Sequence, residues 1–337
     1  MSTIREVAKL AKVSIATVSR VLNQDPTYTI TEETRLRVIS AAEQLQYTLI
    51  PRPKKKSASP DRKSSLRIGC ILRITKRGYN DPYYMSVLSG IESYLRESNI
   101  TLAFIQSAPL LSDPQYLESL FKAPVDGLIL MDPMEDSIYH TIKKMVPHIV
   151  GIDTLRDDID DVGYDHLWNG YLATTHLINK GHTHIGFIGG SGEGDTLEHS
   201  KRYQGYLLAM QVGNLVVRKD WVLDCKWNED ECIEICDTFS KNPDLPTAVF
   251  AASDLLAMAA MKSFYLNKIA VPEQIAVIGM SDIEMSQYTN PPLTTFHVPK
   301  IEIGQAAARL LLSRIHGYQS LPQKIALPTQ FIERNST

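Results

Sequence analysis

Between Ser14 and Asn23 the chain carries small and hydrogen-bonding side chains at the spacing of a short helix. Such side chains suit the major groove of duplex DNA, where hydroxyl, amide and guanidinium groups can bond to base edges and methyl groups can contact thymine. Short amphipathic helices occur in proteins of every class. The spacing alone therefore does not distinguish a DNA-binding helix from a helix with a purely structural role. The residues with this chemistry are Ser14, Ala16, Thr17, Ser19, Arg20 and Asn23.

The helical periodicity of apolar residues predicts the elements that must position these side chains. Ser14 stands where the N-cap of their helix is expected, and Thr31 caps a further helix over residues 31–45. Three short helices with a polar second helix make a helix-turn-helix unit. Their apolar faces are predicted to be Ile4, Val7, Ala8 and Leu10 in the first helix, Ile15, Val18, Val21 and Leu22 in the second, and Val38, Ile39, Ala42 and Leu45 in the third.

Charge separates this N-terminal part from the rest of the chain and favours the nucleic-acid interpretation. Residues 1–65 contain 12 Lys and Arg against 6 Asp and Glu, whereas residues 66–337 contain 23 against 32. A basic segment on an acidic body is typical of a DNA-binding module joined to a second functional unit. The net charge of −3 for the whole chain conceals this division.

Five motifs distributed along the chain point to one family. They are Val13-Ser14-Ile15-Ala16-Thr17-Val18-Ser19-Arg20-Val21-Leu22-Asn23 in the basic segment, then Gly181-His182-x-x-Ile185-Gly186-Phe187-Ile188-Gly189-Gly190, Arg202-x-x-Gly205-Tyr206, Ala252-Ser253-Asp254 and Pro291-Pro292-Leu293-Thr294-Thr295. In this order, and over essentially the whole chain, they resemble the landmarks of the lactose-repressor/galactose-repressor family of bacterial transcription regulators.

From Leu66 onward strand-like and helix-like segments alternate, among them a helix over 82–97 and strands over 126–131 and 324–331. This alternation predicts parallel sheets covered by helices on both faces. This part is long for one sheet, so two doubly wound α/β lobes are expected after an all-α helix-turn-helix head. The resemblance implies a body of the periplasmic-binding-protein type with three chain crossings, which we expect near 160, 290 and 320. The expected domains are a DNA-binding domain at 1–47, a basic hinge or linker at 48–65, and an effector-binding and dimerisation domain at 66–337, with lobe 1 at about 66–160 and 291–320 and lobe 2 at about 161–290 and 321–337.

The resemblance implies roles in DNA binding for particular residues. Ile15 and Ala16 occupy the positions that select the operator sequence in the family. Because both side chains are apolar here, they would recognise DNA through contacts with thymine methyl groups or through DNA shape. Lys12 stands where many relatives have Gly, and Ala58 where they have a Leu that wedges into the minor groove. We therefore expect a hinge that binds mainly through its Lys run, with a solvated linker as the alternative. The predicted DNA-binding residues are Ile4, Ser14, Ile15, Ala16, Thr17, Ser19, Arg20, Asn23, Thr31, Lys54, Lys55 and Lys56.

The resemblance also implies an effector site between the lobes. A sugar offers hydroxyls to bidentate donors and acceptors and an apolar face to aromatic rings. Arg202 matches the family's cleft arginine, although a surface salt bridge is the alternative, and Trp227 aligns with an aromatic that stacks on the ligand. Ser253 stands where relatives commonly have Asn, and Ser281 where they commonly have Asp. The ligand of the best-known relatives therefore cannot be assigned to this chain. The predicted effector-binding residues are Tyr83, Tyr84, Asp153, Arg202, Trp227, Ser253, Asp254, Ser281 and Asp282.

The predicted function is a sequence-specific repressor of a carbohydrate-utilisation operon that a small sugar, such as a galactoside or oligosaccharide, releases from DNA. A homodimer would bind a pseudo-palindromic operator. The alternatives are a sugar-binding transport receptor and a corepressor-type regulator of a purine or sugar phosphate. No catalytic set, cofactor motif or completed metal site is found, and Cys232 and Cys236 are expected to be structural, so an enzyme is not expected. Without an export signal or a long apolar run, the predicted location is the cytoplasm, with no membrane partner.

Overall fold

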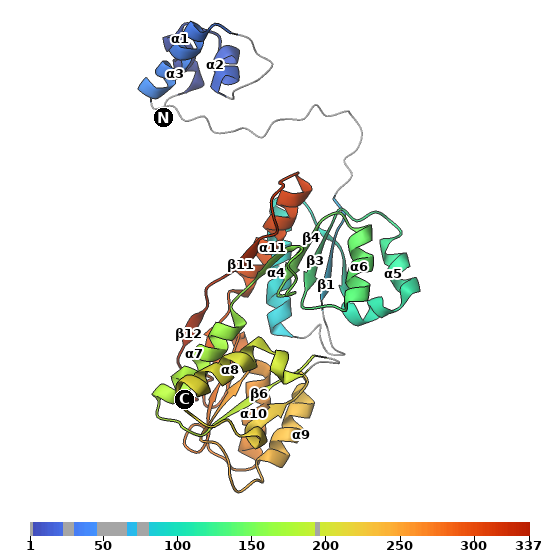
Figure 1. Cartoon of the computed structure of the whole chain (residues 1–337), viewed down its shortest axis with the longest axis vertical. Coiled ribbons are helices and arrows are strands. Elements are labelled where there is room, and N and C mark those ends of the chain that lie inside the picture. The colour runs from blue at the N-terminus through green and yellow to red at the C-terminus, as the bar shows by residue number, and fades with distance from the viewer. Residues whose placement is uncertain (1–2, 23–29, 46–65, 73–80, 193–195) are drawn as a thin grey trace. The chain divides into compact units, whose positions relative to one another are not determined.

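The computed structural model describes residues 3–22, 30–45, 66–72, 81–192 and 196–337. The chain divides into two compact units, Met1–Ser64 and Ser65–Thr337, which we call the head and the body. Figure 1 shows the three helices of the head and the alternating strands and helices of the body. None of the helices in the described ranges has the length and apolar character that crossing a membrane requires.

The head consists of α1 (Ile4–Ala11), α2 (Ile15–Leu22) and α3 (Glu32–Gln44) around a small apolar core. As the capping pattern predicts, the backbone N–H of Thr17 donates to Ser14 Oγ (3.1 Å) at the start of α2. Three residues predicted on the apolar faces are exposed instead, namely Leu10 (46%), Ile15 (45%) and Ile39 (38%), so these three predictions are wrong. The three helices bury instead Val7, Ala8, Ala11, Val18, Val38, Ala41 and Ala42.

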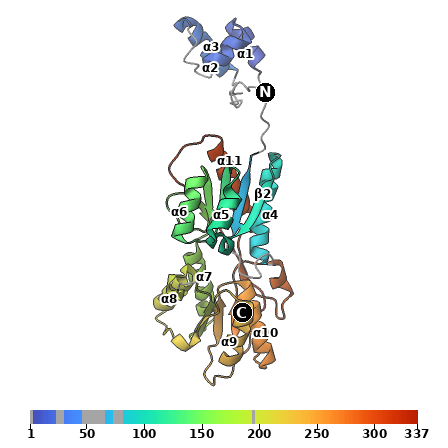
Figure 2. The same cartoon turned by 90° about the vertical axis from the view of Figure 1, so that its right-hand side faces the viewer.

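The larger sheet of the body contains six parallel strands with helices on both faces (Figure 2). Its strand order is β11-β5-β4-β3-β1-β2. The central strands are fully buried apolar runs, as a parallel sheet covered on both faces requires. The strands are β1 (Ile68–Leu72), β2 (Leu102–Ser107), β3 (Gly127–Met131), β4 (Ile149–Ile152), β5 (Asp160–Gly163) and β11 (Lys324–Ala326), and the helices are α4 (Pro82–Glu97), α5 (Pro114–Phe121), α6 (Asp136–Met145) and α11 (Lys300–Ile315).

The smaller sheet of the body has the order β7-β6-β8-β9, also parallel, and forms the second lobe. Its strands are β6 (Ile185–Gly189), β7 (Val222–Asp224), β8 (Ala248–Ala251) and β9 (Ala276–Ile278), with helices α7 (His166–Asn179), α8 (Lys201–Val212), α9 (Glu229–Phe239) and α10 (Asp254–Leu266). Short 3-10 helices lie in the connections: η2 (Ala108–Ser112), η3 (Leu197–His199), η4 (Lys219–Trp221) and η5 (Glu284–Tyr288).

The chain passes between the two sheets after β5, before α11 and after β11. A two-stranded antiparallel ladder of β10 (Thr295–His297) and β12 (Gln330–Ile332) joins two of these passages. The crossing expected near 320 lies later, because β11 pairs with β5 in the larger sheet and only β12 leaves it. Residues 321–326 therefore belong to the first lobe, contrary to the expected boundary, and the single strand that the sequence suggests there is two strands on different sheets.

Candidate functional site

The N-cap and the exposed face of α2 carry most of the predicted DNA-binding side chains that the structure describes. Ser14, Ile15, Ala16 and Arg20 are exposed, whereas Val18 is fully buried in the head core. Thr17 and Ser19 are partly buried at the edge of the same face, and Thr31 is exposed at the start of α3. Ile4 differs from the others, because its side chain packs partly against the core. Predicted residues Asn23, Lys54, Lys55 and Lys56, together with Ala58, lie outside the described residues.

The turn before α2 depends on a backbone conformation that glycine adopts most easily. Lys12 has a φ of 52°, in the left-handed region, and its N–H donates to the carbonyls of Ala8 and Lys9 at the end of α1. The next residue, Val13, donates to Ala8 as well (3.0 Å). A non-glycine residue here costs on the order of 1 kcal/mol, so the turn is held in place at the expense of head stability.

In the body, two aspartates stand at the carboxyl ends of neighbouring parallel strands, where ligands of such sheets bind. Asp132 follows β3 and Asp153 follows β4, and both have left-handed backbones, with φ of 69° and 53°. Tyr84 donates its hydroxyl proton to Asp132, and Tyr83 donates to Asp153 Oδ2 (3.4 Å). Gly163 on β5 makes room for Asp153, because a Cβ there would lie 1.8 Å from Oδ1. The first lobe therefore presents two carboxylates, each oriented by a tyrosine.

The second lobe contributes a guanidinium and an indole. Arg202 on α8 donates from Nε (3.1 Å) and Nη2 (2.6 Å) to the hydroxyl of Tyr164, which follows β5. Its Cζ lies 5.4 Å from the ring centre of Trp227, within the range of a cation–π contact. The loop of Trp227 passes so close to Gly190 that a Cβ on this glycine would lie 2.3 Å from the backbone nitrogen of Trp227.

These groups form one cluster, which we call the interlobe cluster. Its members are Tyr83, Tyr84, Asp132, Asp153, Tyr164, His166, Arg202 and Trp227. Burial raises the pKa of Tyr83 and of Tyr84 well above the ordinary tyrosine value, and the charge of Arg202 opposes this only in part. Burial lowers the pKa of Arg202, but Tyr164, Tyr83 and Asp153 together outweigh burial, so the pKa is raised and the guanidinium stays charged. At neutral pH the tyrosines are therefore neutral donors.

His166 has a buried polar atom that the protein leaves without a hydrogen bond. Its Nε2 lies 2.9 Å from Asp153 Oδ1, but it makes no hydrogen bond within the described chain. The ring stacks on Tyr164, with centroids 3.9 Å apart. Because buried polar atoms in native proteins are nearly always bonded, this nitrogen is suited to a polar ligand.

Sequence reasoning missed three members of the cluster. Asp132 comes directly after a predicted strand, so its place at a strand end was a usable signal. Tyr164 and His166 follow β5. This strand was not predicted, because its two consecutive aspartates interrupt the run of apolar residues that a buried strand usually has.

Four predicted effector residues make contacts within the second lobe and its crossing segments. Ser253 caps α10 by accepting from the Leu256 N–H (3.2 Å). Asp254 is 1% exposed and accepts from Thr295 Oγ1 (2.6 Å) and from the Ile283 N–H (2.8 Å). These two side chains therefore have structural partners, and their part in effector binding stays a prediction.

Ser281 and Asp282 lie at the strained turn that follows β9. Ser281 has a φ of 122° and a buried side chain, and its carbonyl accepts from the Lys300 ammonium group. Asp282 accepts from Arg334 Nη2 (2.6 Å) and lies 3.0 Å from His297 Nδ1. Their described contacts tie the turn to β10 and to the C-terminal segment.

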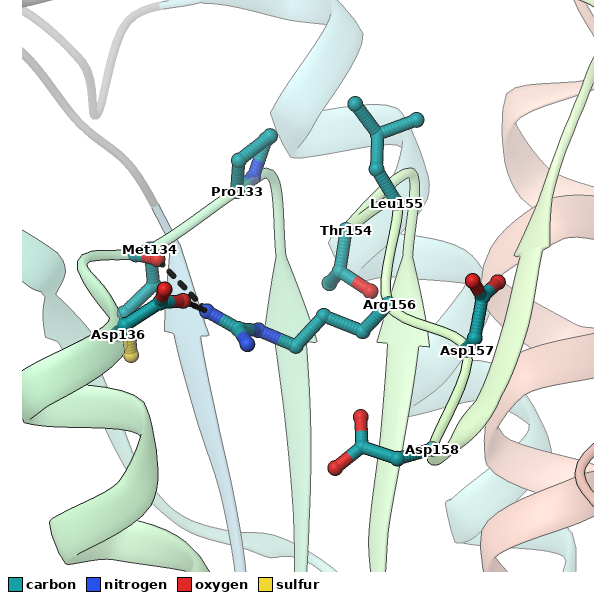
Figure 3. Close-up of a pocket in the computed structure, with 8 residues that line it drawn as sticks. All are labelled: Pro133, Met134, Asp136, Thr154, Leu155, Arg156, Asp157 and Asp158. Carbon is teal, nitrogen blue, oxygen red and sulfur yellow. Dashed lines mark hydrogen bonds and ion pairs between the residues drawn. The ribbon is translucent and has the colours of Figure 1, made fainter.

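A pocket of about 450 Å³ adjoins the cluster on the first lobe (Figure 3). It begins at Pro133 and Thr154, the residues directly after the two strand-end aspartates. Arg156 reaches across it and donates from Nη2 to the Met134 carbonyl (2.9 Å) and to Asp136 Oδ1 (2.6 Å). The lining of the pocket is therefore mixed polar and apolar. Leu155, Asp157 and Asp158 complete its lining.

Comparison with known proteins decides the family. The model described as bacterial regulatory proteins, lacI family, matches residues 3–49, and the periplasmic binding protein-like domain matches residues 174–337. The HTH-type transcriptional repressor PurR of Haemophilus influenzae (strain PittEE) is 33% identical over 350 residues, which cover 100% of this chain and 98% of that protein. The chain belongs to the lacI family of bacterial regulatory proteins. It is a DNA-binding transcriptional repressor rather than an enzyme, and its head binds operator DNA.

Solved structures of lacI-family regulators share this architecture. A complex of the transcriptional regulator CelR with cellobiose has a TM-score of 0.72 at 26% identity and covers 100% of both chains. A LacI family transcriptional regulator from Enterococcus faecium with bound ribose has a TM-score of 0.70 at 26% identity, covering 80% of this chain and 98% of that chain. The family and the fold class predicted from the motifs are confirmed.

Proposed function

We propose that this repressor responds to a neutral sugar that binds in the interlobe cluster. The observation that carries the proposal is the composition of the cluster. Its two oriented carboxylates can accept hydrogen bonds from sugar hydroxyls, and Arg202 can donate hydrogen bonds to ring or hydroxyl oxygens. The ring of Trp227 can stack on the apolar face of a pyranose. His166, whose Nε2 lies 2.9 Å from Asp153 Oδ1, adds one more polar group beside that carboxylate. This mixture of few polar groups with aromatic walls is typical of small-molecule sites.

The charge of the cluster favours a neutral ligand over a phosphorylated one. Among the described residues of the cluster, Arg202 is opposed by Asp132 and Asp153, so a phosphate dianion would meet net repulsion. A purine corepressor is the second candidate, since Trp227 could stack on a planar base and an aspartate could accept from its N–H groups. The related regulators with bound cellobiose and ribose support the sugar.

The pocket beside the cluster favours an effector longer than one ring. The reducing or non-reducing unit of a disaccharide would occupy the cluster, and the second unit would extend toward Pro133 and Leu155. With carboxylates at its rim and apolar side chains in its wall, the pocket offers the same two kinds of contact as the cluster.

On the DNA side we propose a cytoplasmic homodimer that places two heads on a pseudo-palindromic operator. The exposed face of α2 would enter the major groove, with Ile15 and Ala16 at thymine methyl groups and Arg20 at a guanine or a phosphate. Effector binding would release DNA by favouring the body conformation that binds DNA poorly, which requires different sugar affinities in the two states.

The experiment is a thermal-shift screen of the full chain against monosaccharides, disaccharides, sugar phosphates and purines, followed by operator-release assays on DNA selected from a random duplex pool. A true ligand at 100 times its dissociation constant adds about 2.7 kcal/mol of stability. We expect a neutral sugar to shift the melt and release DNA. Arg202→Leu and Asp153→Asn should abolish the shift while keeping DNA binding, and the matched control Arg218→Leu, at a salt bridge to Asp244, should keep both.

Other outcomes reject parts of the proposal. A purine that strengthens DNA binding would replace the sugar inducer with a corepressor. A hit that Arg202→Leu leaves unchanged would place the ligand elsewhere. Unchanged DNA binding in Arg20→Ala would reject the proposed contact of Arg20 with the operator, and the sugar response of this variant should stay intact.

A further inference from the structure

The hydroxyl of Tyr164 has a proton for which the described chain offers no acceptor. Tyr164 lies between β5 and α7 and is 4% exposed. Its oxygen accepts from Nε (3.1 Å) and Nη2 (2.6 Å) of Arg202, so its own O–H is the hydrogen-bonding group that remains. Because buried polar groups in native proteins are nearly always bonded, this proton is suited to a bound molecule.

Helix packing fixes the phenol and the guanidinium in this arrangement. A Cβ on Gly170 of α7 would lie 2.4 Å from the carbonyl oxygen of Arg202, so glycine at this position lets α7 and α8 pack closely. The Tyr164 ring stacks on His166, the first residue of α7, with centroids 3.9 Å apart. The hydroxyl would have to disturb this packing to turn away from Arg202.

Arg202 strengthens the phenol as a donor and offers a second donor beside it. A hydroxyl whose oxygen accepts hydrogen bonds from a cation is polarised, so its own O–H donates more strongly. Burial raises the pKa of Tyr164 and Arg202 opposes this only in part, so the phenol keeps its proton at neutral pH. The Nη1 atom of Arg202 makes no hydrogen bond within the described part of the chain. The pair therefore presents two donor groups, the phenol O–H and Nη1.

His166 connects this donor pair to an acceptor. Its Nε2 lies 2.9 Å from Asp153 Oδ1, and Tyr83 donates to Oδ2 of the same carboxylate (3.4 Å). A ligand group that joins the donor pair to this carboxylate must accept and donate at once. An alcohol hydroxyl does both, whereas an ether or carbonyl oxygen only accepts and an ammonium group only donates.

We propose that Tyr164 is a specificity-determining residue of the effector site, and that its O–H donates to one particular hydroxyl of the sugar. The same sugar hydroxyl accepts from Arg202 Nη1 and donates to Asp153. This inference rests on the proposed function and deepens it, because it selects among neutral sugars by the presence of a hydroxyl at one position. A derivative with hydrogen, fluorine or a methoxy group in place of this hydroxyl loses at least one of the three hydrogen bonds.

The test is isothermal titration of the full-length chain with D-glucose, D-galactose, D-ribose, cellobiose and lactose, followed by the monodeoxy derivatives of each of these sugars that binds. We expect Tyr164→Phe, which removes only the hydroxyl, to weaken binding of the parent sugar about tenfold. One monodeoxy derivative should bind the wild type roughly tenfold to a hundredfold more weakly than its parent, because it leaves buried donors unpaired. For this derivative Tyr164→Phe should cost about twofold or less, since both changes remove the same hydrogen bond.

Two further variants serve as controls. Tyr116→Phe removes a tyrosine hydroxyl that donates to Gln106 Oε1 (2.7 Å) outside the interlobe cluster, and it should bind every sugar as the wild type does. Arg202→Lys keeps the charge but loses the fork of donors, so it should be non-additive with the same monodeoxy derivative. Melting temperatures without sugar show whether each variant is folded.

The outcomes separate this inference from the proposed function. The inference alone is overturned if Arg202→Leu abolishes sugar binding while Tyr164→Phe binds as tightly as the wild type, or if every monodeoxy derivative is additive with Tyr164→Phe. Tighter binding by Tyr164→Phe would also overturn it, because Tyr164 would then compete with the sugar for Arg202. If none of these sugars binds the wild type, the proposed function fails and this inference fails with it.

Discussion

The ion pair between Asp160 and Arg314 fastens the last strand of the larger sheet, and its removal should destabilise the body strongly. Arg314 donates from Nε to Oδ2 (2.7 Å) and from Nη2 to Oδ1 (2.6 Å), and the Gln323 N–H donates to Oδ1 (2.7 Å). Asp160 begins β5, and Gln323 directly precedes β11. The pair therefore joins α11, β5 and β11 at one point.

The exposure of the two partners sets the size of the effect. The side chain of Asp160 is 1% exposed and that of Arg314 is 16% exposed. Replacing Arg314 by Met keeps the aliphatic stem but leaves a buried carboxylate with one backbone donor, which costs about 3–5 kcal/mol. Asp160→Asn should cost less, because the remaining guanidinium can reach water. Since a domain is stable by only about 5–15 kcal/mol, both losses are measurable.

The assay is urea unfolding of the two single variants and the double variant, followed by circular dichroism. Tryptophan fluorescence alone would not serve, because Trp168, Trp221 and Trp227 all lie in the second lobe. The losses should not add, with a coupling energy of about 2 kcal/mol between the sites. Lys143→Met, which breaks an exposed ion pair to Asp158, is the control and should cost under about 1 kcal/mol.

The direction in which stability changes on acidification is an independent test of the same pair. Burial alone would raise the pKa of Asp160, but the hydrogen bonds and charge of Arg314, together with the Gln323 N–H and the charge of Lys324, outweigh burial and hold the pKa below the ordinary value. Its contribution to stability is therefore present above about pH 4 and is lost as the pH falls through the folded-state pKa. In Arg314→Met the carboxylate loses its guanidinium partner and keeps burial against the weaker Gln323 N–H and Lys324 contributions, so the deficit of the variant should shrink on acidification. Additive losses, or a deficit that grows as the pH falls, would refute the reasoning.

Three further predictions concern other contacts. Burial raises the pKa of Asp254 to about 6, so the stability that this residue affects is fully present below about pH 4 and falls as the pH rises to about 6. Melting temperatures between pH 4 and 7 should show this fall in the wild type and less of it in Asp254→Asn; equal slopes would contradict it. Gly90→Ala places a methyl group against the Ile301 carbonyl and should cost roughly 1–3 kcal/mol in urea unfolding; an unchanged midpoint would mean that α4 and α11 move apart freely. Lys12→Gly should stabilise the head by up to about 1 kcal/mol, seen as slower hydrogen exchange of α1 amides in the full chain, and faster exchange would argue against the strain.

Local sequence determined the head and most elements of the body. The N-cap at Ser14 and the apolar spacing of α2 act within one or two helical turns, so the helix and its exposed face could be predicted without knowledge of distant residues. The same holds for α4, whose predicted bounds of 82–97 match the structure. Arg202 was predicted from a motif that keeps its place in the order along the chain, and Trp227 from its alignment with an aromatic residue of the family.

Tertiary structure alone decided the partners of the polar residues. Asp254 has the sequence context of an effector residue, yet Thr295 occupies one of its oxygens from 41 residues away. Residues 324–331 look like one strand, but β11 and β12 separate because their pairing partners, β5 and β10, lie on different sheets. His166 enters the site only because β5 ends beside Asp153. Helix propensity and capping depend on neighbours in the chain, whereas burial, ion pairing and strand register depend on residues that the fold brings together, so only the folded chain determines them.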